Sequence, residues 1–270
     1  MAGPLISLLT DFGSRDPSAA ICRGVILSIV PEARLLDISH DVAKFRIDHG
    51  ALLLWCALPW LPVGTHLAVV DPGVGTERRP IALRTARGDV LVGPDNGLLI
   101  PAAERLGGIV TAALLTSPSA RLAVVSSTFH GRDIFSPAAA HAALGTPLED
   151  LGPAVQPADL VRLAWAPARS ESGRLVAEVR YVDSFGNIKL GVEGTGLEAT
   201  IGELRPGEPL ELSGDATARL PWSDTFDRVP PGELLALTDS YGLVELAANQ
   251  GSAAERLGLR EGMHVELRRA

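Results

Sequence analysis

The hydrophobic period of this sequence changes part-way along the chain, and that change restricts the possible folds more than any other feature. In the first part, short apolar runs such as Leu5 to Leu9 alternate with stretches of helical spacing such as residues 18–30. Strands separated by helices indicate βαβ units and a mostly parallel sheet. From Leu175 onward, apolar and polar residues alternate between frequent glycines, which indicates a small β-barrel or sandwich. The sequence therefore predicts an α/β domain followed by a smaller β-barrel domain.

The stretch between the two patterns marks the domain boundary. From Gly152 to Gly173 the chain contains prolines, alanines and charges without a clear period. We expect the α/β domain over residues 1–155, a linker over 156–173 and the β-barrel domain over 174–270. The further strands expected are Arg34 to Ile38, His66 to Val70, Pro80 to Thr85, Val90 to Val92 and Arg121 to Ser126 before the linker, and Pro209 to Leu212, Leu234 to Leu237, Leu243 to Ala247 and His264 to Leu267 after it.

Composition excludes several classes of protein. Asp and Glu number 32 against 24 Lys and Arg, which gives a net charge of −8, whereas binding to nucleic acid or an anionic membrane requires a basic surface. The longest apolar run, residues 51–63, contains two prolines and is too short to span a bilayer. The first residues lack the basic region of a signal peptide. We therefore expect a cytoplasmic protein without a nucleic-acid or membrane partner, in which Cys22 and Cys56 are buried and inert.

Polar side chains follow several of the expected strands. Asp11, His40, Asp71, Asp95 and His130 each come shortly after the end of one. Any one of them could simply cap a turn, because Asp and Asn are common turn residues. In open α/β sheets, however, ligands bind outside the carboxyl ends of the strands. The convergence of these ends therefore favours a functional site at one edge of the sheet.

The sequence contains none of the common catalytic motifs. The glycine-rich residues 71–76 lack the lysine of a phosphate-binding loop, and neither GxSxG nor HExxH occurs. Asp71, Arg78 and His130 could together hold a water molecule, since a carboxylate and an imidazole accept protons whereas a guanidinium only donates. An ion pair between Asp71 and Arg78 beside a structural histidine is an equal alternative from the residues alone. A metal is not expected, because Arg78, Arg79 and Arg132 would repel a cation.

Seven short motifs, occurring in order, make the sequence resemble a known family. The chain is similar to the S-adenosyl-L-methionine hydroxide adenosyltransferases, the water-using branch of the superfamily that also holds the fluorinase and the chlorinase. The match runs nearly end to end and is weakest over residues 150–175 and 190–230. The motifs are Thr10-Asp11-Phe12-Gly13, Asp37-Ile38-Ser39-His40, residues 68–76, Pro94-Asp95-Asn96-Gly97-Leu98-Leu99, Phe129-His130-Gly131-Arg132-Asp133, Asp183-Ser184-Phe185-Gly186-Asn187 and Asp239-Ser240-Tyr241-Gly242.

The resemblance implies cleavage of S-adenosyl-L-methionine, in its (R)-sulfonium form, to adenosine and L-methionine without a metal or organic cofactor. It also implies a homotrimer with active sites between the domains of neighbouring subunits. Water activation would fall on Asp71, Arg78 and His130, with Asp71 or His130 taking the proton while Arg78 holds the oxygen. The ribose would contact Asp11, and Tyr241 stands where the fluorinase has an arginine near the methionine carboxylate. The remaining substrate contacts would fall on Phe45, Asp183, Phe185, Asn187, Phe226 and Ser240.

Two departures and three alternatives accompany the resemblance. Besides Tyr241, the chain reads Lys189-Leu190-Gly191 where the family more often has a Thr-Asn pair. A halogenase is one alternative, but the carboxylate of Asp71 would repel the halide ion that such an enzyme must bind. A non-catalytic sensor of adenosine or of the sulfonium is another, and a nucleosidase attacking C1′ is the third. The identity of the products separates these activities.

Overall fold

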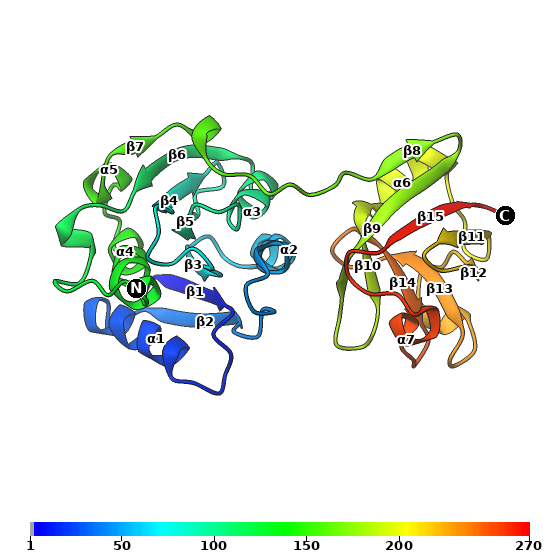
Figure 1. The fold of residues 1–270 in the computed structure, drawn as a ribbon, viewed down its shortest axis with the longest axis horizontal. Coiled ribbons are helices and arrows are strands. Elements are labelled where there is room, and N and C mark those ends of the chain that lie inside the picture. Colours follow the sequence, from blue (N-terminus) through cyan, green and yellow to red (C-terminus); the bar gives the residue numbers. More distant parts are fainter. Residues whose placement is uncertain (1–2) are drawn as a thin grey trace. The chain divides into compact units, whose positions relative to one another are not determined.

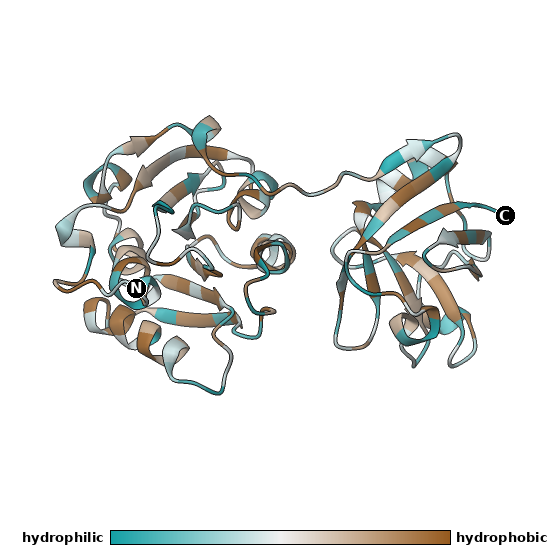
Figure 2. Cartoon of the chain, viewed as in Figure 1, coloured by the Kyte–Doolittle hydropathy of each residue, from teal (hydrophilic) through white to brown (hydrophobic). Residues whose placement is uncertain are grey.

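The computed structural model describes residues 3–270, which form two compact units (Figure 1). One unit extends to Ala164 and the other begins at Trp165. Each unit has its own hydrophobic core, and the strands of the second unit carry polar as well as apolar residues (Figure 2). No helix among residues 3–270 is long and apolar enough to cross a membrane.

The first unit is built on a seven-stranded sheet with the order β2-β1-β3-β5-β4-β6-β7. The first four strands of this order run parallel, and the other three extend the sheet in antiparallel fashion. The α/β class with a mostly parallel sheet is thereby confirmed. The strands are β1 (Leu5–Thr10), β2 (Arg34–Ser39), β3 (Thr65–Val69), β4 (Pro80–Thr85), β5 (Val90–Pro94), β6 (Ile109–Leu114) and β7 (Ala154–Val155).

Helices cover both faces of this sheet. Cys22 and Ile26 of α1 share one core with Ile6 and Leu8 of β1 and with the alanines of α4. On the other face, Gly50 of α2 lies so close to Leu9, Val70 and Leu98 that a larger residue would not fit without displacing them. The helices are α1 (Ser18–Ile29), α2 (Ile47–Ala57), α3 (Ile100–Arg105), α4 (Ser136–Ala143) and α5 (Leu148–Leu151).

Both cysteines are buried, as predicted. Cys22 lies in α1 and Cys56 in α2, and neither is part of a disulfide. Burial raises the pKa of the Cys22 thiol to about 11. A thiol that does not ionise near neutral pH is a poor nucleophile, which fits the expectation that Cys22 is inert.

The strand expected over Arg121 to Ser126 is wrong. This segment is irregular, and the backbone N–H groups of Leu122 and Ser126 donate to the carbonyl and the carboxylate of Asp133 instead of to a neighbouring strand. Val124 is 80% exposed. The apolar run therefore does not enter the sheet, and His130 follows an irregular segment rather than a strand.

The second unit is a nearly closed antiparallel barrel with the strand order β12-β11-β15-β9-β10-β14-β13. A bridge between Trp222, next to β12, and Ala236 of β13 joins the two ends of this order. The predicted C-terminal β-barrel is confirmed. Its strands are β8 (Arg169–Glu171), β9 (Arg174–Val182), β10 (Ile188–Glu193), β11 (Pro209–Gly214), β12 (Ala218–Pro221), β13 (Leu234–Thr238), β14 (Leu243–Ala248) and β15 (His264–Arg269), and its helices are α6 (Gly194–Ile201) and α7 (Ala253–Leu257).

Candidate active site

A cavity of about 350 Å³ lies where the parallel strands β1 and β3 end. Asp11 directly follows β1, Asp71 follows β3 by two residues, and His130 immediately precedes the π-helical turn Gly131–Phe135. The three side chains therefore come from different parts of the chain to one cavity. The full lining is Asp11, Phe12, Ser18, Lys44, Phe45, Val69, Asp71, Val74, Thr128, Phe129, His130 and Gly131.

Two other polar residues at strand ends serve the fold instead of lining this cavity. His40 Nδ1 lies 2.8 Å from Thr10 Oγ1. Asp95 is buried and accepts hydrogen bonds from Arg79 Nε at 2.8 Å and from the backbone N–H of Val161 at 2.9 Å. The sequence predicts both residues near a site because each follows a strand, but their side chains stabilise loops.

Arg78 connects Asp71 to His130. Its Nε donates to Asp71 Oδ1 at 3.0 Å, its Nη2 donates to Asp71 Oδ2, and the same Nη2 lies 3.0 Å from His130 Nδ1. The side chains of Arg78 and Asp71 are 7% and 5% exposed. Asp71 and His130 line the cavity, whereas Arg78 does not. The guanidinium thus lies behind the two residues and fixes their positions.

This contact determines which nitrogen of His130 carries a proton. A guanidinium can only donate hydrogen bonds, so His130 Nδ1 must be the acceptor. In the neutral ring the proton is then on Nε2. Burial and the charge of Arg78 lower the pKa of His130 below its usual value of 6.5, against the opposite effect of Asp71. His130 is therefore neutral near pH 7 and is a hydrogen-bond donor through Nε2.

Asp11 combines a structural contact with a free acceptor. Its Oδ2 accepts the backbone N–H of Phe45 at 3.0 Å, and Lys44 Nζ donates to its backbone carbonyl. Phe45 has a positive φ of 64° and is 70% exposed, so the Asp11 carboxylate holds a loop in an unfavourable conformation. Asp11 Oδ1 accepts no hydrogen bond from residues 3–270 and remains available to a ligand that has hydroxyl groups.

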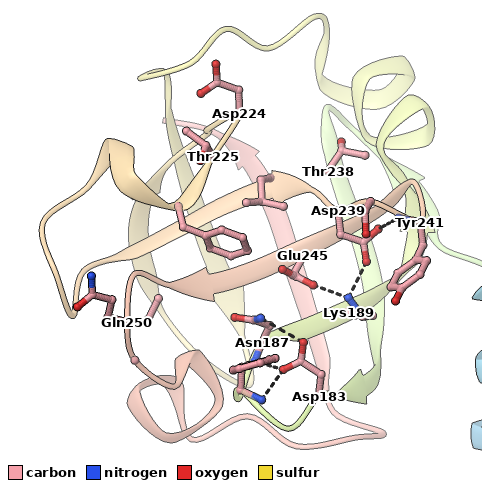
Figure 3. Close-up of a pocket in the computed structure, with 16 residues that line it drawn as sticks. Asp183, Asn187, Lys189, Asp224, Thr225, Thr238, Asp239, Tyr241, Glu245 and Gln250 are labelled. Carbon is pink, nitrogen blue, oxygen red and sulfur yellow. Dashed lines mark hydrogen bonds and ion pairs between the residues drawn. The ribbon is translucent and has the colours of Figure 1, made fainter. Parts of the chain in front are cut away.

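The second unit contains a larger cavity of about 810 Å³. All six residues of this unit that the resemblance places at the substrate line it: Asp183, Phe185, Asn187, Phe226, Ser240 and Tyr241. Phe185 is 78% exposed and Phe226 is 42% exposed, so neither belongs to the core. Figure 3 shows Asp183 and Asn187 coming from the β9–β10 connection, Asp239 and Tyr241 from the β13–β14 connection, Lys189 from β10 and Glu245 from β14.

A buried cluster of charges lies beside this cavity. Lys189 Nζ donates to Asp239 Oδ2 at 2.6 Å and to Glu245 Oε2 at 2.5 Å, and the three side chains are 7%, 5% and 3% exposed. Burial raises the pKa of Glu245, with Lys189 opposing the shift. Burial alone would lower the pKa of Lys189, but its bonds to the two carboxylates raise it, so the lysine remains charged.

Comparison with known proteins identifies the family. Residues 6–152 match the SAM hydroxide adenosyltransferase N-terminal domain, and residues 177–266 match the C-terminal domain. The chain belongs to the SAM hydroxide adenosyltransferase family. No group of three or more His, Cys, Asp or Glu residues that could hold a metal ion occurs within residues 3–270.

Relatives of this chain include proteins named as hydrolases and proteins named as fluorinases. An (R)-S-adenosyl-L-methionine hydrolase from Salinispora tropica is 48% identical over 96% of this chain and 95% of its own length. A fluorinase from an Actinoplanes species is 30% identical over 99% of this chain and 98% of its own length. The crystal structure of an uncharacterized conserved protein from Thermotoga maritima superimposes with a TM-score of 0.92 at 31% identity, covering 98% of this chain and all of that one.

Several residues of the two cavities were missed by the sequence analysis. Thr128 and Phe129 precede His130 and line the first cavity. Asp239 and Glu245 line the second. Asp239 carries a signal in the sequence, because Asp239-Ser240-Tyr241-Gly242 repeats the pattern of Asp183-Ser184-Phe185-Gly186. Glu245 has no comparable signal, since its place beside Lys189 depends on the register of β10 and β14.

The protonation of His130 can be tested without any assumption about activity. We expect an NMR titration of the His130 ring to give a midpoint below 6.5, with the ¹⁵N shifts of the neutral ring showing a proton on Nε2. In Arg78→Met the midpoint should rise, because a repelling positive charge is removed and Asp71 remains. A wild-type midpoint above 6.5, or a proton on Nδ1, would contradict this assignment.

Proposed function

We propose that this protein hydrolyses S-adenosyl-L-methionine, in its (R)-sulfonium form, to adenosine and L-methionine by attack of water at C5′. The observation that carries the proposal is the arrangement of Asp71 and His130, which lie together on one cavity and are both bonded to Arg78. Family membership and the names of the hydrolase relatives support it. No cofactor is required by the reaction described below.

The difficult part of this reaction is the activation of the nucleophile, water. As the oxygen of water bonds to C5′, the C5′–S bond breaks, and its electron pair leaves with sulfur as a neutral thioether that needs no general acid. Complete deprotonation of water beforehand would cost about 12 kcal/mol at pH 7, from a pKa of about 15.7 and about 1.36 kcal/mol per unit. Transfer of the proton while the O–C5′ bond forms avoids this cost, because the oxygen becomes acidic as it loses electron density.

Asp71 is the better proton acceptor of the two candidates. His130 Nδ1 is occupied by Arg78 and its Nε2 carries a proton, so the ring cannot accept one in this arrangement. Each oxygen of Asp71 takes one hydrogen bond from Arg78 and has a further lone pair. We assign Asp71 as the general base and His130 as a donor that orients the water. Arg78 positions both from behind and does not itself hold the oxygen.

The remaining substrate contacts are assigned by the chemistry of each group. Asp11 Oδ1 is an open acceptor suited to a ribose hydroxyl. The exposed rings of Phe45, Phe185 and Phe226 would bury the nucleoside. Asp183, Asn187, Ser240 and Tyr241 supply polar contacts for the adenine and the amino-acid end. The protein would act in the cytoplasm as a homotrimer with active sites between neighbouring subunits, as the family resemblance implies.

The roles of Asp71 and His130 lead to different effects of substitution. Asp71→Asn removes the base and should lower kcat by about 10²–10⁴-fold. His130→Gln can still accept from Arg78 and donate to water, so its kcat should fall by about tenfold or less. Both variants should bind adenosine with near wild-type affinity by calorimetry. The reverse order of the two kcat losses would make His130 the base.

Asp11 should affect binding of the nucleoside rather than the chemical step. Asp11→Asn replaces a charged acceptor by a neutral amide that can still accept the Phe45 N–H. Because hydrogen bonds to charged groups contribute about 1.5–3 kcal/mol, we expect adenosine affinity to fall by about tenfold or more. Unchanged affinity in a titration calorimeter would remove Asp11 from ribose recognition.

The identity of the products tests the proposed reaction directly. The purified protein is incubated with S-adenosyl-L-methionine containing both sulfonium epimers, in buffers with and without chloride, and the products are separated by chromatography. Adenosine and methionine in both buffers, with the (S)-epimer left over, are expected. A 5′-chloro product would indicate a halogenase and free adenine a nucleosidase. Bound adenosine without turnover would indicate a sensor.

A further inference from the structure

The second cavity is bordered by two turns that have the same local structure. One connects β9 to β10 through Asp183–Asn187, and the other connects β13 to β14 through Asp239–Leu243. In each turn, Oδ1 of the first aspartate accepts the N–H groups of the third and fifth residues, at 2.9 and 3.0 Å in the first and at 2.8 and 2.9 Å in the second. In each, the fourth residue is a glycine with positive φ.

The turns differ at their fifth residue. In the first turn, Asn187 Nδ2 donates to Asp183 Oδ2 at 3.1 Å, so the aspartate is satisfied within its own turn. In the second turn the fifth residue is Leu243, which has no side-chain donor. The equivalent oxygen, Asp239 Oδ2, instead accepts Lys189 Nζ at 2.6 Å from the neighbouring strand β10 (Figure 3). Lys189 thus occupies the role that an asparagine has in the first turn.

Glu245 of the neighbouring strand β14 also holds Lys189 in place. The two residues are register partners in the antiparallel pair β10–β14, and their charged groups are 2.5 Å apart. The Lys189 ammonium also lies 5.2 Å from the centre of the Tyr241 ring, within the range of a cation–π interaction. These contacts fix the ammonium between strand β14 and the Asp239–Leu243 turn. Removing one partner from such a buried ion pair would leave an uncompensated charge.

We infer that Lys189 is a positioning residue for substrate binding: anchored on Glu245, it holds the Asp239–Leu243 turn so that Ser240 and Tyr241 face the cavity. This inference rests on the proposed function, in which Ser240 and Tyr241 contact the substrate. Lys189 lies in the second unit, and Asp71 and His130 lie in the first. Its removal should consequently weaken substrate binding and leave the chemical step largely unchanged.

The first test removes the charge of Lys189 together with that of its anchor. In Lys189→Met/Glu245→Gln, we expect KM for S-adenosyl-L-methionine to rise by about tenfold or more while kcat stays within about threefold. The control is Arg174→Met, because Arg174 also bridges two carboxylates of the barrel, Glu171 and Glu266, but on its exposed surface. The control should keep the wild-type KM. A folded double variant with wild-type KM, or with a loss confined to kcat, would overturn the inference.

The second test restores the turn by the means that the first turn already uses. Adding Leu243→Asn to the double variant places an amide at the fifth position, where it can donate to Asp239 Oδ2 as Asn187 donates to Asp183. We expect KM to return to within about threefold of wild type. If the double variant does not fold, Lys189→Gln, which keeps a donor without the charge, takes its place and should raise KM by about threefold or more. Failure of the added asparagine to lower KM in the folded variant counts against the inference.

The third test does not depend on catalysis. Amide hydrogen exchange of residues 239–243 reports the N–H groups of Tyr241 and Leu243, which are bonded to Asp239 Oδ1. Exchange should become about tenfold faster or more in the double variant and slow again when Leu243→Asn is added, while residues 183–187 stay as in wild type. Unchanged exchange would overturn the role of Lys189. Absence of hydrolysis by the wild-type protein would overturn the proposed function alone.

Discussion

The bond between Arg78 and its two neighbours is the interaction on which the first cavity depends. Because a guanidinium donates at every position, it aligns the Asp71 carboxylate and determines the tautomer of His130 at the same time. Neither residue is held in this orientation by the strand ends alone, since His130 immediately precedes a π-helical turn and Asp71 lies in the loop after β3. The chemistry available to the cavity is thus decided by a side chain that does not line it.

The sequence predicts which residues lie at the site edge of the sheet, because the carboxyl ends of its parallel strands all lie at that edge. Asp11 and Asp71 lie in the cavity for this reason. The same rule also selected His40 and Asp95, whose side chains bond to Thr10 and Arg79. The rule identifies an edge but cannot say which polar groups there are already satisfied, because their partners lie far away in the sequence. The sequence also leaves open whether Arg78 holds the water or pairs with Asp71, and the pair with Asp71 is seen only in the structure.

The second unit shows a different limit of sequence analysis. The period-two pattern predicted the barrel, and motif resemblance selected Asp183, Asn187 and Ser240, which share one cavity in the structure. In the sequence, Lys189 is distinguished only as part of a departure from the family pattern. Its partners Asp239 and Glu245 are 50 and 56 residues away along the chain, and only strand register brings them together. The prediction of a strand over Arg121 to Ser126 is wrong for a related reason. Asp133 accepts hydrogen bonds from backbone N–H groups that would otherwise pair with a neighbouring strand.

The two turns at the second cavity also restrict how this sequence can change over time. The first turn carries its own asparagine, so strand β10 can vary without disturbing it. In the second turn the donor to Asp239 is Lys189 of β10, so the residue needed at position 243 depends on the residue at position 189. A lineage that replaced Lys189 first would pass through a form with two unpaired buried carboxylates, whereas one that first acquired an amide at position 243 would not. Among relatives that keep Asp239, the residues at these two positions are therefore expected to vary together, and in that order.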